Sequence, residues 1–563
     1  NKLLEKKIIE DRKVEIDRIT NKHKTSISLQ DLSPDQSKAF DQIKDELLKK
    51  NIVLFQGVTS SGKTAIYMKL IKEITDNGGQ VLFLLPEISI TSQMVSRFNN
   101  YFAGIVQVYH SKFNLNERTE IWKSVSQAKN NARVIIGARS SLFLPFKKLD
   151  LIVVDEEHDT SYKQDEGIRY NARDMAISRA SIEDVPVLLS TSIPSLETYN
   201  NVKKKKYNIT KLEKRYKNFS LPNAEIVNLQ LKKKNKNIWI DTKTLNLVNK
   251  YLNKKEQVLF FLNRRGYAPF LICKKCGNKL TCPHCSIFLT FHKHINKALC
   301  HHCGFKKNTK EKCNKSNLNC EFNMYGPGVE KIYSEIKQMF PKKNIKILSS
   351  DFLKKEKETS NLLHDIENNK IDILVGTQLI SKGFNFPNLN CIVVVDADFS
   401  GMGFDLRSTE KNIQLYNQLS GRAGRFSRDS LIIYQTFNPY DETLKNILEN
   451  KPEKFLEEEI YLRREKKLPP FVRLIAFIIS SKNEKESYIE AQKLKKSLSV
   501  LKQIEVMGPV TSPIFKIKNK YRTRLLIRCN NDIFIQKEIV KILKKINISK
   551  KIKLTVDVDP LNF

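Results

Sequence analysis

The sequence predicts an α/β fold with two successive lobes, each built around a parallel β-sheet. Short apolar runs of strand length alternate with helical patterns, which is typical of doubly wound parallel sheets. In the first half these runs cover residues 52–55, 81–85, 134–136, 151–154 and 187–189. The same rhythm returns at residues 257–262, 345–348, 371–375, 391–395 and 431–435. A cysteine-rich block interrupts the second series, so we expect an inserted module there.

The elements follow in order along the chain. Ser33-Pro34 supplies an N-cap and a proline at the first helical position, which predicts a helix to about Lys50. A second helix is predicted over residues 65–75, directly after a glycine-rich loop. Beyond Pro439 a helical segment leads to a smaller α+β region that begins near Leu474.

We expect the following division into domains. Residues 1–31 are polar and charged, and form a linker or the remnant of missing N-terminal domains. Lobe 1 covers 32–215 and lobe 2 covers 216–440, with a zinc-binding module at 270–323 inserted into lobe 2. Residues 441–563 form a helical connector and a C-terminal domain.

Composition favours a nucleic-acid partner without deciding it. The 563 residues carry a formal net charge of +37 and an isoelectric point near 9.6, values typical of proteins that bind polyanions. Lysine is abundant everywhere, however, including in evident loops at 203–206 and 232–236, and a compositional drift of the whole proteome would give the same excess. No stretch of 18 or more apolar residues occurs, so we expect no membrane span.

The first chemical signature is a glycine-rich loop between a predicted strand and a predicted helix. In loops of this spacing the backbone N–H groups surround the β-phosphate, the lysine reaches the β/γ-phosphates and the last hydroxyl binds Mg²⁺. We therefore predict an ATP–Mg²⁺ site at Gly57, Ser60, Ser61, Gly62, Lys63 and Thr64.

The second signature is an acidic cluster after an apolar strand, Asp155-Glu156-Glu157-His158. The carboxyl end of a parallel strand faces the ligand crevice, so Asp155 is predicted to hold Mg²⁺ and Glu156 to polarise the attacking water. The alternative, a solvated turn, does not account for the buried strand before it. His158 is interpreted either as a relay to nucleic acid or as a structural cap.

The third signature is Gln418-Leu419-Ser420-Gly421-Arg422-Ala423-Gly424-Arg425. Its small residues allow the other lobe to approach, and Arg422 and Arg425 lie three apart on one face. Arginines placed in this way stabilise the transition state of phosphoryl transfer, by roughly 10³ to 10⁵ in rate. The predicted catalytic residues are thus Lys63, Asp155, Glu156, Gln418, Arg422 and Arg425.

The fourth signature is the cysteine block, which holds eight of the ten cysteines. Pairs of cysteines with two residues between them supply two thiolates each, and two such pairs complete a tetrahedral Zn²⁺ site. A disulfide framework is the alternative, but without an apolar leader the chain is expected in the cytosol, where disulfides are rare. We predict two Zn²⁺ ions bound by Cys273, Cys276, Cys282, Cys285, Cys300, Cys303, Cys313 and Cys320. The nearby His292, His294, His301 and His302 are taken as surface residues.

Together these segments resemble superfamily two helicases, and the cysteine block narrows the resemblance to the primosomal replication-restart helicases, the PriA family. Segments 85–88 and 137–143 are similar to DNA-contacting motifs of that family, and 162–170 to its aromatic-rich loop. Segments 263–267, 376–383 and 396–398 correspond in lobe 2, and 508–509, 521–522 and 557–560 in the C-terminal domain. The resemblance runs from about Leu32 to Pro560.

The resemblance implies two RecA-like lobes and an ATP-driven DNA helicase or translocase that moves 3′ to 5′ and restarts replication at stalled or branched forks. The implied partners are branched and single-stranded DNA, primosome loading proteins, the replicative helicase and single-strand-binding protein, in the cytoplasm in association with the nucleoid. It also implies DNA contacts by Arg139, Ser140, Tyr162, Lys163, Arg169, Tyr170, Arg264, Arg265, Thr377 and Lys382. The inner cysteine pairs, 282/285 and 300/303, would share one zinc and the outer ones the other.

Three departures from the family pattern qualify these expectations. The family's 3′-end-binding and winged-helix domains are expected before Leu32 and are not recognised there, which puts 3′-end recognition in doubt. The family's Gly-Ser-Ala-Thr-Pro stretch reads Ser190-Thr191-Ser192-Ile193-Pro194, and Ile193 lacks a hydroxyl, so unwinding is expected to be weaker. Ser316 stands at the usual position of the last cysteine, and Cys320 lies four residues later.

Two further functions stay open as alternatives. A scaffold with a non-unwinding motor would bind DNA and proteins only, and an RNA helicase would share the acidic motif but is disfavoured by the zinc block. For single residues, Gln36 either reads the adenine edge or lies on the helix surface. Tyr162 and Tyr170 either stack on bases, which would contribute about 1–3 kcal/mol each to binding, or pack in the core. Cys391 and Cys529 are interpreted as buried structural residues.

Overall fold

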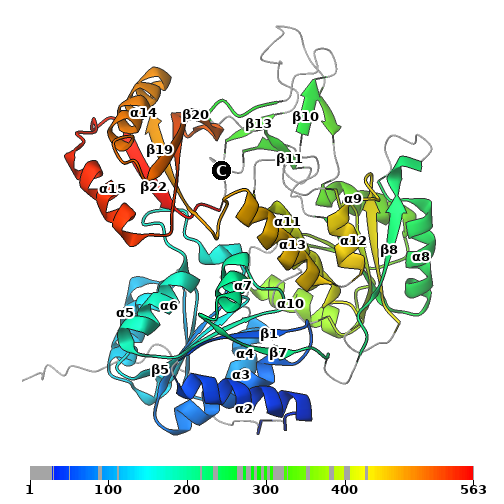
Figure 1. Cartoon of the computed structure of the whole chain (residues 1–563). Coiled ribbons are helices and arrows are strands. Elements are labelled where there is room, and N and C mark those ends of the chain that lie inside the picture. The colour runs from blue at the N-terminus through cyan, green and yellow to red at the C-terminus, as the bar shows by residue number, and fades with distance from the viewer. Residues whose placement is uncertain are drawn as a thin grey trace, which may run out of the picture.

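The computed structural model describes residues 28–29, 31–49, 51–86, 92–110, 113–215, 219–231, 239–262, 270–273, 280–284, 288–292, 297–300, 305–308, 322–325, 328–349, 356–378, 386–398, 406–424, 429–449 and 451–561. Two lobes lie side by side, and a C-terminal domain packs beside them (Figure 1). None of the helices in these ranges is long and apolar enough to cross a membrane.

Lobe 1 is built on a seven-stranded sheet in which every pairing is parallel. In spatial order its strands are β3 (Val106–Tyr109), β4 (Val134–Gly137), β2 (Gln80–Leu84), β5 (Leu149–Asp155), β6 (Val187–Thr191), β1 (Ile52–Gly57) and β7 (Asn208–Leu212). Its helices are α2 (Pro34–Leu48), α3 (Lys63–Asp76), α4 (Ser92–Tyr101), α5 (Leu115–Ser126), α6 (Ala172–Glu183) and α7 (Leu196–Lys203). Apolar clusters cover both faces of this sheet, so its central strands are buried.

Lobe 2 repeats the arrangement with six parallel strands. Their order is β15 (Ile345–Leu348), β16 (Ile373–Gly376), β9 (Gln257–Phe261), β17 (Leu389–Val394), β18 (Leu431–Thr436) and β8 (Asn223–Asn228). The helices are α8 (Thr242–Asn253), α9 (Val329–Met339), α10 (Glu356–Glu367), α11 (Ser408–Ser420), α12 (Glu442–Leu448) and α13 (Pro452–Glu465). The predicted parallel α/β fold is therefore confirmed in both lobes.

Within the two parallel sheets, the three strands that the sequence did not predict, β3, β7 and β8, all lie at sheet edges. An edge strand is covered on fewer sides, so its residues need not form a continuous apolar run. β7 and β8 accordingly mix buried with partly or fully exposed residues. The predicted strands lie mostly in the sheet interiors, where the apolar signal is strongest.

The Cys-rich module contributes short antiparallel strands between β9 and α9. They are β10 (Phe270–Cys273) paired with β14 (Phe322–Tyr325), and β11 (Thr290–His292), β12 (Lys297–Leu299) and β13 (Lys306–Asn308). Its small core contains Cys282 and Cys300 next to Leu289 and Phe291.

The C-terminal domain is an antiparallel sheet with two helices. Its strands are β20 (Ile504–Ile517), β21 (Lys520–Cys529), β19 (Arg473–Ser481) and β22 (Lys553–Val558), and its helices α14 (Glu484–Leu498) and α15 (Ile533–Lys545). Lys518 and Asn519 join β20 to β21 and both have positive φ, as a tight hairpin requires. The backbone N–H of Asn519 donates to the carbonyl of His284 at 3.0 Å, so this hairpin contacts the Cys-rich module.

Candidate nucleotide cleft and DNA-motor site

The phosphate loop lies between β1 and α3, as the sequence predicted. Gly62 has a φ of +84°, and a Cβ there would lie 2.3 Å from Nε2 of Gln36, so a side chain would be strained and crowded. The ammonium group of Lys63 donates to the carbonyl of Gly57 at 2.8 Å, which folds the lysine back over the loop. The hydroxyl of Ser61 is buried and has no hydrogen-bond partner in the described part of the chain. A loop with an unsatisfied buried hydroxyl and a lysine fits a phosphate group.

Gln36 supports this loop from helix α2. Its side chain accepts from the backbone N–H of Ser33 at 3.0 Å, which completes a capping box, and donates to the carbonyl of Ser61 at 3.1 Å. Gln36 is only 3% exposed, so the alternative of an exposed helix-surface glutamine is wrong. The sequence could not show this burial because it depends on the contact between α2 and the loop.

The two predicted catalytic carboxylates stand at the carboxyl end of β5. Burial, together with the neighbouring charge of Glu156, raises the pKa of Asp155 to about 6, while Lys63 acts in the opposite direction. The hydroxyl of Tyr67, on α3, donates to Oδ1 of Asp155 at 3.0 Å. Glu156 has a φ of +48°, a left-handed conformation that is strained for a residue with a side chain and occurs often at functional sites.

Lobe 2 reaches the acidic cluster through Gln418. Its Nε2 lies 3.4 Å from Oε2 of Glu156 and 3.1 Å from Nε2 of His158. His158 also contacts the hydroxyl of Thr191 through Nδ1 at 2.6 Å, and that hydroxyl donates to the carbonyl of Ile193. Because the Thr191 hydroxyl is already a donor, this geometry makes Nδ1 of His158 the protonated nitrogen and Nε2 the acceptor from Gln418. His158 thus links Gln418 of lobe 2 to the 190–194 segment of lobe 1.

The predicted arginine loop also lies at this cleft. Burial lowers the pKa of Arg422, and the negative charges of Glu156 and Asp155 oppose that shift, which places all three groups in one electrostatic environment. The hydroxyl of Ser60 donates to the carbonyl of Gly421 at 3.1 Å, so the phosphate loop touches the arginine loop directly. Arg425 lies outside the described residues.

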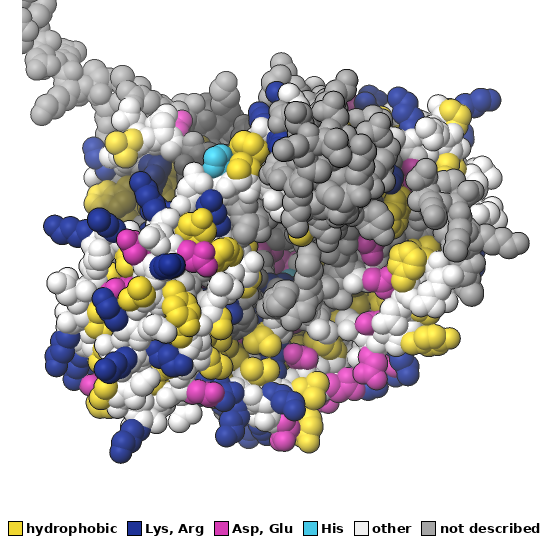
Figure 2. All heavy atoms as spheres, turned by 90° about the horizontal axis from the view of Figure 1, so that it is seen from above, with side chains coloured by type: hydrophobic (Ala, Val, Ile, Leu, Met, Phe, Trp, Pro, Cys, Tyr) yellow, Lys and Arg dark blue, Asp and Glu magenta, His cyan; other side chains and the backbone are white. Residues whose placement is uncertain are grey.

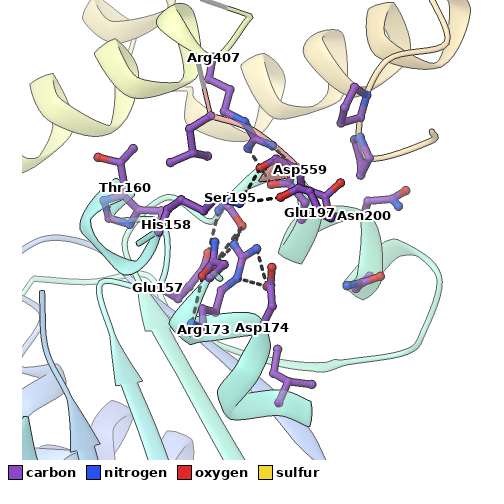
Figure 3. Close-up of a pocket in the computed structure, with 18 of the residues that line it drawn as sticks. Glu157, His158, Thr160, Arg173, Asp174, Ser195, Glu197, Asn200, Arg407 and Asp559 are labelled. Atoms are coloured by element: carbon purple, nitrogen blue, oxygen red, sulfur yellow. Dashed lines mark hydrogen bonds and ion pairs between the residues drawn. The ribbon is translucent and has the colours of Figure 1, made fainter. Parts of the chain in front are cut away.

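A buried polar network that the sequence did not reveal lies beside this cleft (Figure 3). Glu157 accepts from Arg173 at 3.0 Å and from the backbone N–H of Ser195 at 2.7 Å. Arg407 of lobe 2 forms a bidentate pair with Glu197 at the start of α7. These residues line a cavity of about 800 Å³ between lobe 1, lobe 2 and the C-terminal domain. Single charged residues give no periodic signal in a sequence. This network could therefore be found only from which residues lie next to one another in the folded structure.

Two predicted DNA contacts need correction. The ring of Tyr162 is 1% exposed and its hydroxyl donates to the carbonyls of Leu84 and Asp155, so Tyr162 packs in the core and is not available for base stacking. Lys163 is 4% exposed and forms an ion pair with Asp557 of the C-terminal domain, so it does not present its charge to a DNA strand.

The other predicted DNA contacts divide into three groups. Arg169 also pairs with Asp557, and Arg139 donates to the carbonyl of Lys163 at 2.8 Å. Tyr170 is half-buried against Phe143, Ser140 is partly exposed and Thr377 is buried. Arg264, Arg265 and Lys382 lie outside the described residues. On the described part of the face seen from above, lysine and arginine side chains are scattered among apolar and acidic ones (Figure 2).

The structure describes the side chains of two of the eight predicted zinc ligands. Cys282 and Cys300 are both buried in the small core of the Cys-rich module, which brings one thiol from each inner pair into the same cluster. This placement fits a shared metal site. The side chains of Cys273, Cys276, Cys285, Cys303, Cys313 and Cys320 lie outside the described residues. Cys391 and Cys529 are buried in lobe 2 and in the C-terminal domain.

Comparison with known protein families finds four matching models. Residues 33–200 match the DEAD/DEAH box helicase model, residues 322–427 the helicase conserved C-terminal domain, residues 282–307 the PriA DNA helicase Cys-rich region and residues 464–561 the primosomal protein N C-terminal domain. These matches fall within both lobes, the Cys-rich module and the C-terminal domain.

Curated relatives cover nearly the whole chain. The replication restart protein PriA of Rickettsia conorii is 38% identical over 535 residues, which is 95% of this chain and 82% of the relative. That of Bacillus subtilis is 32% identical, over 94% of this chain and 66% of the relative. Among solved structures, the Mycobacterium smegmatis helicase Lhr bound to ssDNA and AMP-PNP has a TM-score of 0.47 and 13% identity, over 74% of this chain and 48% of that one.

Proposed function

The chain belongs to the PriA family of replication restart proteins, and we propose that it is an ATP-hydrolysing DNA helicase or translocase that moves 3′ to 5′ on a single strand and restarts replication at stalled or branched forks. The observation that carries this proposal is the contact of Gln418 with Glu156 and His158. It joins the two lobes at the acidic motif, where closure of the cleft would control ATP hydrolysis and movement along DNA.

The residues of the cleft divide the work of hydrolysis. Lys63 and the backbone of the phosphate loop bind and orient the triphosphate, and Glu156 positions and polarises the attacking water. Arg422, with Arg425 by the family pattern, offsets the negative charge that develops on the γ-phosphate. Thr64 and Asp155 would hold a Mg²⁺ ion, which neutralises phosphate charge. Tyr67 donates to Asp155 and thereby orients that carboxylate.

We assign two Zn²⁺ ions to the Cys-rich module. The inner site would use Cys282, Cys285, Cys300 and Cys303, and the outer one Cys273, Cys276, Cys313 and Cys320. The burial of Cys282 and Cys300 in one small cluster supports the inner site. The module's short strands offer little apolar surface, so the metal would supply much of its stability.

The proposed partners follow from the family. They are branched and single-stranded DNA, primosome loading proteins, the replicative helicase and single-strand-binding protein, in the cytoplasm in association with the nucleoid. Arg139, Ser140 and Tyr170 remain the proposed DNA contacts among the described residues, together with Arg264, Arg265 and Lys382 outside them. Arg169, which pairs with Asp557, and Thr377, which is buried, are not proposed again.

A DNA- and protein-binding scaffold with a non-unwinding motor is disfavoured. The sequence arguments for it were the N-terminal domains not recognised before Leu32 and Ile193, which lacks the hydroxyl expected there. Ile193 is 2% exposed and packs with Ile413 and Leu456 across the lobe boundary, so an apolar contact joins the lobes at this point. Thr191 still contacts His158 through its hydroxyl. The apolar contact across the lobe boundary supports a motor in which the lobes move together.

The test measures ATP turnover without nucleic acid, with forked DNA and with RNA. We expect forked DNA to stimulate ATP turnover. Stimulation by RNA alone would indicate an RNA helicase. Equally low turnover under all three conditions would indicate a scaffold. Lys63→Ala should abolish turnover and leave DNA binding intact, and Glu156→Gln should bind ATP without hydrolysing it. Lys72→Ala, which removes an exposed lysine of the same helix, is the matched control. Strand displacement from duplexes with a 3′ or a 5′ single-stranded tail then tests the direction.

A further inference from the structure

Arg215 is a buried arginine at the crossing from lobe 1 to lobe 2. It follows β7, is 6% exposed and donates to backbone carbonyls of three separate segments. Nε donates to Thr59 at 3.2 Å, Nη2 to Ala423 at 3.3 Å and Nη1 to Ser220 at 2.6 Å. One side chain therefore links the phosphate loop, the arginine loop and the connector between the lobes.

No carboxylate among the described residues pairs with Arg215. Its described partners are the three carbonyl oxygens, and burial lowers its pKa with no acidic group of the described residues to offset the shift. The other two buried arginines among the described residues do have carboxylate partners: Arg173 pairs with Glu157 and Arg463 with Glu459. A buried cation is costly unless an anion lies nearby, so the position of Arg215 favours a negatively charged group in the cleft.

The two loops that Arg215 joins are already in contact. A Cβ on Gly421 would lie 2.2 Å from Cβ of Thr59, so only glycine permits this approach. The hydroxyl of Thr59 is buried and without a hydrogen-bond partner in the described part of the chain. Because this contact is so close, a small shift of either loop changes the distance between the phosphate loop and Arg422.

We propose that Arg215 is a positioning residue for ATP hydrolysis, which braces the phosphate loop against the arginine loop and supplies positive charge to the nucleotide cleft. The inference rests on the proposed function of this cleft and adds a residue that neither the phosphate-loop pattern nor the arginine motif contains. Arginine suits the role because its planar guanidinium carries five N–H donors and can reach several carbonyls at once, whereas a lysine ammonium is a single point.

The experiment separates the bracing role from the charge. Arg215→Lys keeps the charge but cannot span the three carbonyls, and Arg215→Met removes both the charge and the hydrogen bonds. Lys214→Ala is the matched control, because Lys214 is the neighbouring residue, has a side chain 67% exposed and pairs only weakly with Asp35 at 3.5 Å. For each folded variant the measurements are kcat and KM for ATP, the affinities for AMP-PNP and ADP, and the melting temperature without nucleotide.

We expect Arg215→Lys to lower kcat about tenfold or more with AMP-PNP affinity within about threefold of the wild type. Arg215→Met should lower kcat similarly and also weaken AMP-PNP binding about tenfold, more than ADP binding, because the triphosphate carries more charge. Unchanged kcat, KM and nucleotide affinities in folded Arg215→Met would overturn the inference, even if the melting temperature fell. If instead the wild type hydrolyses ATP no faster than Lys63→Ala, the proposed function fails, and the AMP-PNP affinities still decide the role of Arg215.

Discussion

Lys163 of lobe 1 and Asp557 of the C-terminal domain form a buried ion pair, with 2.9 Å between Nζ and Oδ1. Arg169 pairs with the other carboxylate oxygen of Asp557. Both cations belong to the loop that follows the acidic motif, in which Tyr162 donates to the carbonyl of Asp155 at 2.6 Å. The C-terminal domain is therefore attached to a loop that directly contacts the carboxyl end of β5, where Asp155 lies.

Replacing Asp557 with alanine should detach the C-terminal domain from lobe 1. Removal of one partner from a buried ion pair costs about 3–5 kcal/mol, because the remaining charges stay buried without a counter-ion. We expect the midpoint of the first unfolding transition to shift to a lower urea concentration. We also expect proteases to cleave between the domains faster than in the wild type. Glu505→Ala is the control, since it breaks an exposed pair with Arg528 in the same sheet and should cost less than about 1 kcal/mol. Equal effects of both variants would contradict the structural role of Asp557.

Replacing Gln418 with alanine should slow ATP hydrolysis more than it weakens ATP binding. Its contacts with Glu156 and His158 form only when the lobes are together, and hydrogen bonds to charged groups contribute about 1.5–3 kcal/mol. That range corresponds to roughly a 10- to 150-fold lower kcat with little change in KM. Gln414→Ala removes a weaker 3.5 Å contact to Pro194 from the same helix and should have a much smaller effect. A rise in KM without a change in kcat would show that Gln418 only binds the nucleotide.

The pair of Glu197 with Arg407 should make stability depend on pH in the acid range. Burial alone would raise the pKa of Glu197, but the charge and hydrogen bonds of Arg407 outweigh it and hold this pKa well below the ordinary value of 4.5. A lowered folded pKa adds stability that is complete above about pH 4.5 and is lost progressively as the pH falls further.

Glu197→Gln should therefore be less stable than the wild type at pH 7, and the difference should shrink steadily between pH 4.5 and pH 3. Denaturant midpoints at several pH values measure this difference. Glu453→Gln, which breaks an exposed pair with Lys211, should differ little from the wild type throughout. A Glu197→Gln deficit that stays constant down to pH 3 would mean that lost packing, and not the charge, causes it.

Metal analysis of the purified protein should find two zinc ions per chain, the outer one more easily removed by a chelator. The loop between Cys313 and Cys320 is longer than a two-residue knuckle and costs more to order. Cys300→Ser should reduce the content to one zinc and unfold the module around Phe291. Cys391→Ser and Cys529→Ser change buried cysteines elsewhere and should retain both ions. Two zinc ions in Cys300→Ser would refute the inner site.

Much of the cleft was predictable because its signals are local. The phosphate loop, the acidic strand end and the arginine loop each depend on spacing within eight residues or fewer, and the central strands on apolar runs that only a buried parallel sheet explains. The capping box of Ser33 and Gln36 is local in the same way.

The sequence by itself thus determined the two parallel-sheet lobes, the position of the proposed nucleotide site and the presence of the cysteine module. Only the tertiary structure decided which polar side chains face solvent and which join distant segments. It buried Tyr162 and Lys163, which the sequence placed on DNA, and it brought Arg215 to Thr59 and Ala423. The physical reason is that the cost of burying a charge or hydroxyl depends on its partners, and those partners come from segments far apart in the chain.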